Sequence, residues 1–152
     1  MIMAQRLIKF RGKHIVTGEW LYGSHFNDGG EQYILPNNIL DIDEYEDKFE
    51  VNPDTVGEYI GLTDKYGNGI YEGDVVKRHC FAYGLDDTGI VKFDNETAMF
   101  VLYCEEKIFA KKLSFLKSET INDGYATIQE TFTYEIIGNI HDNPEMVKIL
   151  EE

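Results

Sequence analysis

The chain has 152 residues, with 14 Lys or Arg against 28 Asp or Glu, so its formal charge is −14. Such a charge argues against binding nucleic acid over the whole surface, because that binding needs cations that displace counterions from phosphates. The hydrophobic fraction of 43% and the aromatic fraction of 13% exclude a disordered acidic tail.

No apolar run in the sequence reaches the roughly 18 residues that a membrane-spanning helix needs. The first five residues are not followed by an apolar segment, so we expect no secretory signal and a cytoplasmic protein. The two cysteines, Cys80 and Cys104, are too few for a disulfide framework and lack the spacing of a zinc site.

Turn residues and short apolar runs alternate through the first 50 residues. We predict strands over residues 6–10, 20–22 and 32–35, with a turn at Gly12-Lys13 and another at Asn27-Asp28-Gly29-Gly30. Residues 41–50 are acidic with few apolar side chains. They are read as a solvated connector or a short surface helix, and as the boundary between two parts of the chain.

The remaining residues are also rich in aromatic and β-branched side chains, which favour strands. Strands are predicted over residues 56–62, 75–78, 89–93, 98–103 and 132–140, with tight turns over 64–69 and 72–74. Residues 107–116 fit a helix and a strand about equally. Asn143-Pro144-Glu145 predicts a helix start, because Asn caps a helix and Pro suits its first position.

These elements indicate a mainly β protein, or a β-rich α+β protein, with the character of a small barrel or sandwich. We expect residues 1–50 to form an irregular β-rich N-terminal part. Residues 51–152 are expected to form a core with a barrel-like, SH3-like sheet and a short C-terminal helix. The two parts can equally belong to one continuous domain.

The sequence contains no recognisable catalytic, cofactor-binding or metal-binding motif, so we assign none of these sites and expect no enzyme and no cofactor. The glycines from Gly67 to Gly73 lack the strand and helix of a phosphate loop. None of the four histidines forms a metal-ligating pair with another. The adjacent acids Asp86 and Asp87 are read as a solvated turn, although paired carboxylates can also bind magnesium or act in general acid–base catalysis.

The basic residues form two small islands. Residues 105–118 contain four lysines against two acids, and a nucleic-acid contact is considered for Lys107, Lys111, Lys112 and Lys117. Residues 1–40 contribute Arg6, Lys9, Arg11 and Lys13, which can extend that contact if they share a face. Eight acids each in residues 41–60 and 119–152 oppose this interpretation and can instead pair locally with the lysines.

Three blocks of the sequence form a recognisable pattern: Lys9–Lys13 with Gly18–Gly23, the long block Val51–Val76, and Tyr134–Met146. Together they resemble the YopX-like family of bacteriophage and prophage proteins. The long block contains Val51-Asn-Pro-Asp-Thr-Val-Gly57 and Gly67-Asn-Gly-Ile-Tyr-Glu-Gly-Asp74. The sequence departs from the family pattern at Gly69, where Lys is common, and at His141, where an aromatic residue is common.

The resemblance implies a small β-rich protein with a barrel-like C-terminal part, and it brings no catalytic residues with it. The leading hypothesis is a non-enzymatic phage or prophage accessory protein that acts through protein–protein contacts. Its partner would be an unidentified host or phage protein, or a second copy of the chain. The alternative is a nucleic-acid-associated regulatory protein that uses the Lys107–Lys117 island.

Overall fold

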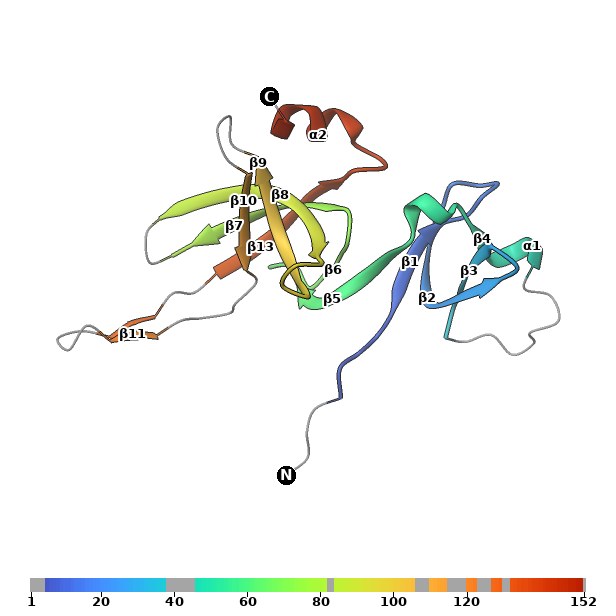
Figure 1. Ribbon diagram of the computed structural model, residues 1–152, viewed down its shortest axis with the longest axis horizontal. Helices are drawn as coiled ribbons and strands as arrows, with labels where there is room; N and C mark the ends of the chain where they lie inside the picture. The colour runs from blue at the N-terminus through green and yellow to red at the C-terminus, as the bar shows by residue number, and fades with distance from the viewer. Residues whose placement is uncertain are drawn as a thin grey trace. The chain divides into compact units, whose positions relative to one another are not determined.

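A computed structural model describes residues 5–37, 46–81, 84–105, 110–114, 120–122, 127–129 and 132–151. The chain divides into two compact units, Met1–Gly61 and Leu62–Glu152 (Figure 1). The boundary expected from the sequence, between residues 50 and 51, precedes this division. No helix among the described residues is long and apolar enough to cross a membrane.

The first unit is built on antiparallel strands. They are β1 (Phe10–Lys13), β2 (Trp20–Asp28), β3 (Glu31–Leu35), β4 (Glu50–Val51) and β5 (Gly57–Thr63). A short helix α1 (Glu46–Phe49) precedes β4, and a 3-10 turn η1 (Pro53–Thr55) follows it. The strand order is β4-β3-β2-β1-β5-β6, in which β5 passes into the second unit and β6 (Gly69–Tyr71) belongs to that unit.

The core of the first unit lies around Val51, which is 1% exposed and packs against β1. A Cβ atom on Gly12 would lie only 2.9 Å from Val51 Cγ2, so this close approach requires glycine. Val51 also pairs with His14 in an isolated bridge beyond the end of β1. Tyr33 and Ile34 on β3 are also buried in this unit.

The predicted strand at residues 6–10 and turn at Gly12-Lys13 are wrong. The strand occupies Phe10–Lys13, and the turn follows at residues 15–17. The backbone N–H of Lys13 donates to Thr55 Oγ1 at 2.8 Å, which ties the end of β1 to η1. Gly12 therefore marks a close packing contact within a strand and not a reversal of the chain.

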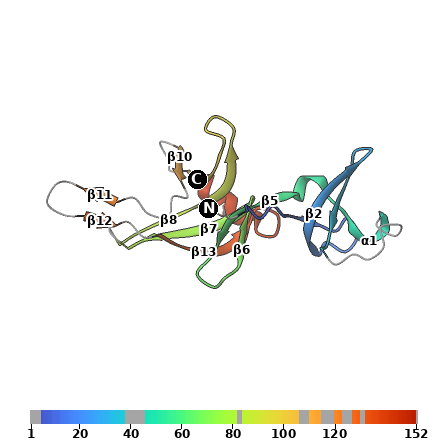
Figure 2. The ribbon, with the colours of Figure 1, turned by 90° about the horizontal axis from the view of Figure 1, so that it is seen from below.

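The second unit contains an antiparallel sheet with the strand order β10-β9-β8-β7-β13. Its strands are β7 (Asp74–Cys80), β8 (Leu85–Asp94), β9 (Met99–Glu105), β10 (Ala110–Ser114) and β13 (Phe132–Asn139). A two-stranded sheet pairs β11 (Thr120–Asn122) with β12 (Thr127–Gln129), and the helix α2 (Pro144–Glu151) follows β13. Strands β7, β8 and β13 run side by side in Figure 2.

Alternation of side chains along the strands separates the two faces of this sheet. The strand registers place an apolar set on one face, and its members are buried: Val76, Cys80, Val91, Leu102 and Tyr134. The same registers place a polar set on the other face at the β13 end of the sheet: Lys77, His79, Asp86, Thr133 and Glu135. At its β13 end the sheet thus combines a largely apolar core face, which also holds the ion pair of Arg78 with Asp87, with an exposed face that carries the other charges.

The mainly β fold is confirmed. The predicted hairpin of residues 89–93 and 98–103 corresponds to the pairing of β8 with β9, and α2 begins at Pro144 as expected. Within the ambiguous stretch 107–116, residues 110–114 form β10, and the rest lies outside the described residues. The described part of the second sheet is open, with β10 and β13 at its two edges, and no closed barrel forms there.

Candidate functional site

The described acidic residues near the turns of the second unit do not converge on one pocket. Asp74 is buried and accepts a hydrogen bond from the backbone N–H of Tyr71 at 2.8 Å. Asp86 and Asp87 are consecutive in β8, not in a turn as predicted, so they point to opposite faces of the sheet. Among the side chains that the structure describes, no three His, Cys, Asp or Glu residues are placed to hold a metal ion.

Asp64 organises the turn between β5 and β6. Its carboxylate accepts the backbone N–H groups of Tyr66 at 3.0 Å and of Asn68 at 2.8 Å. It also accepts the backbone N–H of Ile136 on β13. The next residue, Lys65, donates its own N–H to the carbonyl of Tyr134 at 2.8 Å. The turn is therefore fixed along the outer edge of β13, and it places Lys65 beside the polar face of the sheet.

Hydrogen bonding controls the protonation of Asp64. Burial raises its pKa, but the hydrogen bonds from Asn68, Tyr66 and Ile136 together outweigh burial. The pKa of Asp64 consequently lies below its ordinary value of 3.8, and the carboxylate is ionised at neutral pH.

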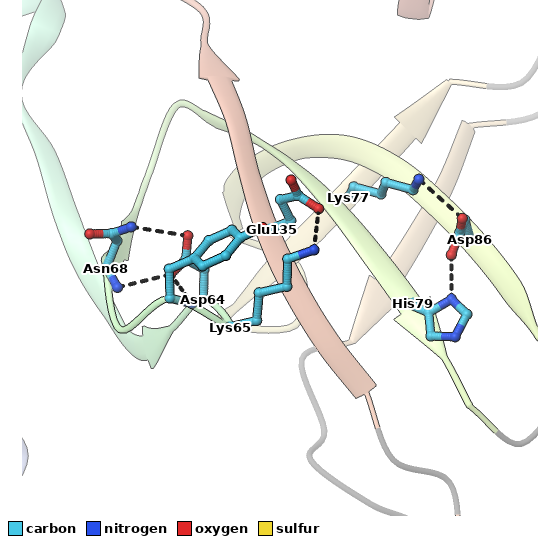
Figure 3. A network of polar contacts seen from close by, with 8 residues as sticks. Asp64, Lys65, Asn68, Lys77, His79, Asp86 and Glu135 are labelled. Carbon is cyan, nitrogen blue, oxygen red and sulfur yellow. Dashed lines mark hydrogen bonds and ion pairs between the residues drawn. The ribbon is translucent and has the colours of Figure 1, made fainter.

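Charged side chains form a network over β13, β7 and β8, which Figure 3 shows from close by. Lys65 Nζ lies 2.7 Å from Glu135 Oε2, and Lys77 Nζ lies 3.2 Å from Asp86 Oδ2. The other oxygen of Asp86 forms a hydrogen bond with His79 Nδ1 at 2.5 Å. The registers explain this arrangement, because Lys77 lies opposite Glu135 and His79 lies opposite Asp86.

The network shifts the ionisation of two of its members. The hydrogen bond with His79, followed by that with Lys77, lowers the pKa of Asp86. The hydrogen bond with Glu135 is the largest cause of a raised pKa for Lys65. Both groups therefore remain charged over a wider pH range than they would alone.

The network lines a concavity of about 390 Å³ on the second unit. Its lining comprises Lys65, Lys77, His79, Phe81, Asp86, Thr133, Tyr134 and Glu135. Phe81 is 60% exposed, and its ring packs edge-on against His79 at 4.7 Å between centroids. Tyr66 is 69% exposed, and its ring centroid lies 5.1 Å from Lys65 Nζ. Two exposed aromatic rings thus contact members of the network, Tyr66 at Lys65 and Phe81 at His79.

We call this set the β7–β13 surface: Lys65, Tyr66, Lys77, His79, Phe81, Asp86 and Glu135. The sequence did not predict that these residues lie together. The signal was the alternation of Lys77 with His79 and of Asp86 with Thr88, which places each pair on one face of a strand. Which of the chain's many acids would pair with these bases depends on strand register, and the sequence does not reveal that register.

The lysine island of residues 105–118 is only partly described. Lys111 and Lys112 are consecutive residues of β10, opposite Cys104 and Tyr103 of β9, at the other edge of the sheet from β13. Lys107 and Lys117 lie outside the described residues. The nucleic-acid contact of these four lysines stays a prediction.

The basic residues of the first unit are largely stacked on aromatic rings. Arg11 and Lys13 lie over the Trp20 ring, with the guanidinium carbon of Arg11 4.4 Å from its centroid. Lys9 Nζ lies 4.5 Å from the centroid of Tyr59. Arg6 instead forms an ion pair with Glu58. Arg11 and Lys13 of β1, and Arg6 and Lys9 before it, thus make contacts within the first unit.

Comparison with known proteins identifies the family of the chain. No curated protein matches the chain significantly. The family model described as YopX protein matches residues 9–148, which is nearly the whole chain and includes both the Asp64 turn and the β7–β13 surface. The chain therefore belongs to the YopX family.

Proposed function

We propose that this YopX-family protein is a phage- or prophage-derived accessory protein that acts in the cytoplasm through protein–protein contacts and is not an enzyme. The β7–β13 surface carries the proposal. It combines two exposed aromatic residues, Tyr66 and Phe81, with paired charges between them. Aromatic anchors among polar contacts are typical of protein–protein interfaces.

The energetics of the network support a role in recognition. The side chains of its ion pairs are between 36% and 45% exposed, and such pairs contribute only about 0–1 kcal/mol each to folding. Mixed charges contribute mainly to the choice of partner and to the rate of association, and buried aromatic side chains supply affinity. The two kinds of residue lie together on this surface, so it suits a selective contact.

The proposal is tested with a double variant, Tyr66→Ala with Phe81→Ala. A matched control changes two exposed apolar residues at the β8–β9 hairpin, Phe93→Ala with Met99→Ala. Tagged proteins are incubated with bacterial host lysate at low and at raised salt, and self-association is followed by light scattering.

We expect the unchanged protein and the control to retain the same stoichiometric partner, or the same self-association. Loss of two aromatic anchors should weaken that contact at least about tenfold. The proposal is wrong if no stoichiometric partner or self-association is found at either salt concentration. It is equally wrong if the two double variants behave alike.

A further inference from the structure

The turn between β5 and β6 ends in the only Asn-Gly pair of the sequence, Asn68-Gly69. The side-chain amide of an asparagine can be attacked by the backbone nitrogen of the residue that follows it. Glycine hinders this attack least, because it has no Cβ atom and allows the backbone the widest range of conformations. From the sequence, Asn68 therefore carries the amide of this chain that is easiest to attack in this way.

Three other exposed asparagines, Asn27, Asn52 and Asn95, are less suited to this reaction. Asn52 precedes Pro53, whose nitrogen carries no hydrogen and cannot form the new bond. Asn95 precedes Glu96, whose side chain hinders the approach of the backbone nitrogen. Asn27 is followed by an aspartate, and its Oδ1 already accepts a backbone N–H of its own turn at 3.2 Å. These residues provide internal references for Asn68.

Hydrogen bonds to Asp64 hold residue 68 in the turn (Figure 3). The Asn68 backbone N–H donates to Asp64 Oδ1 at 2.8 Å, and the Asn68 carbonyl accepts the backbone N–H of Asp64 at 2.8 Å. The Asn68 side chain is exposed, and its Nδ2 lies 3.4 Å from Asp64 Oδ2, which is a long hydrogen bond. The backbone is thus held firmly and the amide weakly, so the attack takes place when the turn opens locally. Exposed turns open at a lower cost in free energy than the whole fold.

We propose that Asn68 is a site of spontaneous deamidation, and that the products weaken the attachment of the Asp64 turn to β13. In the first step the backbone nitrogen of Gly69 forms a bond to Asn68 Cγ and the Cγ–Nδ2 bond breaks. Nδ2 leaves as ammonia and takes the proton of the Gly69 nitrogen with it. Water then opens the resulting succinimide ring, at the side-chain carbonyl to give aspartate or at the main-chain carbonyl to give isoaspartate. Water is the only co-reactant, and no electrons are transferred.

Both products conflict with the hydrogen bonds of Asp64. An aspartate at residue 68 replaces the donor Nδ2 by a second carboxylate, which repels the ionised carboxylate of Asp64. An isoaspartate adds a methylene group to the main chain between the N–H and the carbonyl that bond to Asp64, so the two bonds lose their present geometry. Asp64 also accepts the backbone N–H of Ile136. A disturbed Asp64 therefore loosens the turn along the edge of β13.

The same turn carries two members of the β7–β13 surface, Lys65 and Tyr66. Lys65 reaches Glu135 from the turn, and its backbone N–H bonds to the carbonyl of Tyr134. Loosening of the turn therefore displaces an ion pair and an exposed aromatic ring of that surface. The deamidation itself does not depend on the proposed function, whereas its effect on partner binding rests on that function.

The test is incubation of the full folded chain at neutral and at alkaline pH, followed by trypsin digestion and mass spectrometry. Trypsin cleaves after Lys65 and Lys77, so residues 66–77 form one peptide with a single asparagine. We expect this peptide to gain the mass difference between NH₂ and OH and to separate into an aspartate and an isoaspartate form. Conversion should be at least about tenfold faster at Asn68 than at Asn95, because glycine leaves the attacking nitrogen accessible. It should also be faster at alkaline pH, since the attacking nitrogen must lose its proton.

Variants of the two residues complete the design. Gly69→Ala keeps the asparagine and should slow its conversion about tenfold, because the added methyl group hinders the attack. Asn68→Asp and Asn68→Ser both remove Nδ2, but only Asn68→Asp adds a charge beside Asp64, so it should lower the midpoint of urea denaturation further.

Several results overturn the inference. Conversion at Asn68 that is no faster than at Asn95 does so, as does conversion that Gly69→Ala leaves unchanged. Equal urea midpoints for Asn68→Asp and Asn68→Ser overturn the effect on the turn. If a partner is captured but Asn68 does not convert, the inference falls and the protein-contact function stands. If Asn68 converts but no partner or self-association is found, the inference stands and the proposed function falls.

Discussion

Asp64 shows how one side chain can fix both a turn and a neighbouring strand. It is 6% exposed, and its carboxylate accepts hydrogen bonds from backbone N–H groups of its own turn and of β13. Charge-assisted hydrogen bonds are stronger than neutral ones, and an orphaned buried donor costs about 1–3 kcal/mol. The Asp64 turn also occupies part of the free edge of β13, where an unpaired strand would invite pairing with another chain.

We predict that Asp64→Ala lowers the free energy of unfolding by about 2–3 kcal/mol, because several N–H groups lose their acceptor. Asp64→Asn should cost about 1 kcal/mol, because its amide oxygen still accepts from the turn. Urea denaturation followed by circular dichroism measures both values. Asp54→Ala, at an exposed position in η1, is the control and should change stability by less than about 0.5 kcal/mol.

Urea denaturation of the unchanged protein and of Asp64→Asn at several pH values gives the pH dependence of stability. The folded-state pKa of Asp64 lies below its ordinary value of 3.8, so near this pH the unfolded chain binds more protons. The stability that the carboxylate provides is therefore complete above 3.8 and is lost as the pH falls through the lower, folded-state pKa. The advantage of the unchanged protein over Asp64→Asn should decrease over that acidic window. A constant difference down to about pH 2 would contradict this account.

At the scale of elements, local signals predicted some structures well and others poorly. The β8–β9 hairpin and the start of α2 depend on residues close together in the sequence, such as Asn143 and Pro144, and both were predicted. The bounds of β1 were not predicted, because close packing against Val51, which is distant in the sequence, requires glycine at residue 12. The β7–β13 surface was missed for the same reason, since its pairs form between strands whose register only the folded sheet defines.

We predict that Gly12→Ala destabilises the protein by about 1–3 kcal/mol through overpacking. The added Cβ would meet three carbon atoms of Val51 at 2.9 to 3.1 Å. Val51→Ala alone should cost about 2 kcal/mol, because it leaves a cavity in the first unit. The double variant should be less destabilised than the sum of the two changes, since the smaller side chain makes room for the methyl group.

The unchanged protein, the two single variants and the double variant form a double-mutant cycle. Urea denaturation of these four proteins gives the coupling energy between residues 12 and 51. A coupling of about 1 kcal/mol or more confirms the contact between these two residues. Strict additivity would mean that Gly12 is required for another reason, such as its backbone conformation.

At the scale of the whole molecule, the net charge of −14 is the sum over surfaces that differ in charge. The β7–β13 surface is balanced, with Lys65 and Lys77 opposite Glu135 and Asp86. Arg11 of β1 is stacked on Trp20, and Lys9, just before β1, is stacked on Tyr59. The molecule thus presents a neutral patch with aromatic residues within an acidic whole, which favours contacts with selected proteins and disfavours polyanions such as DNA.

The last prediction concerns nucleic acid. At about 0.15 M salt we expect no binding of single- or double-stranded DNA or of RNA by fluorescence anisotropy, because an acidic molecule gains little from counterion release. Any binding at low ionic strength should weaken on Lys111→Glu with Lys112→Glu more than on a control with equal charge, Lys48→Glu with Lys148→Glu. Binding that persists at 0.15 M salt and is lost only in the Lys111 and Lys112 double variant would contradict the protein-contact proposal and favour a regulator that acts on nucleic acid.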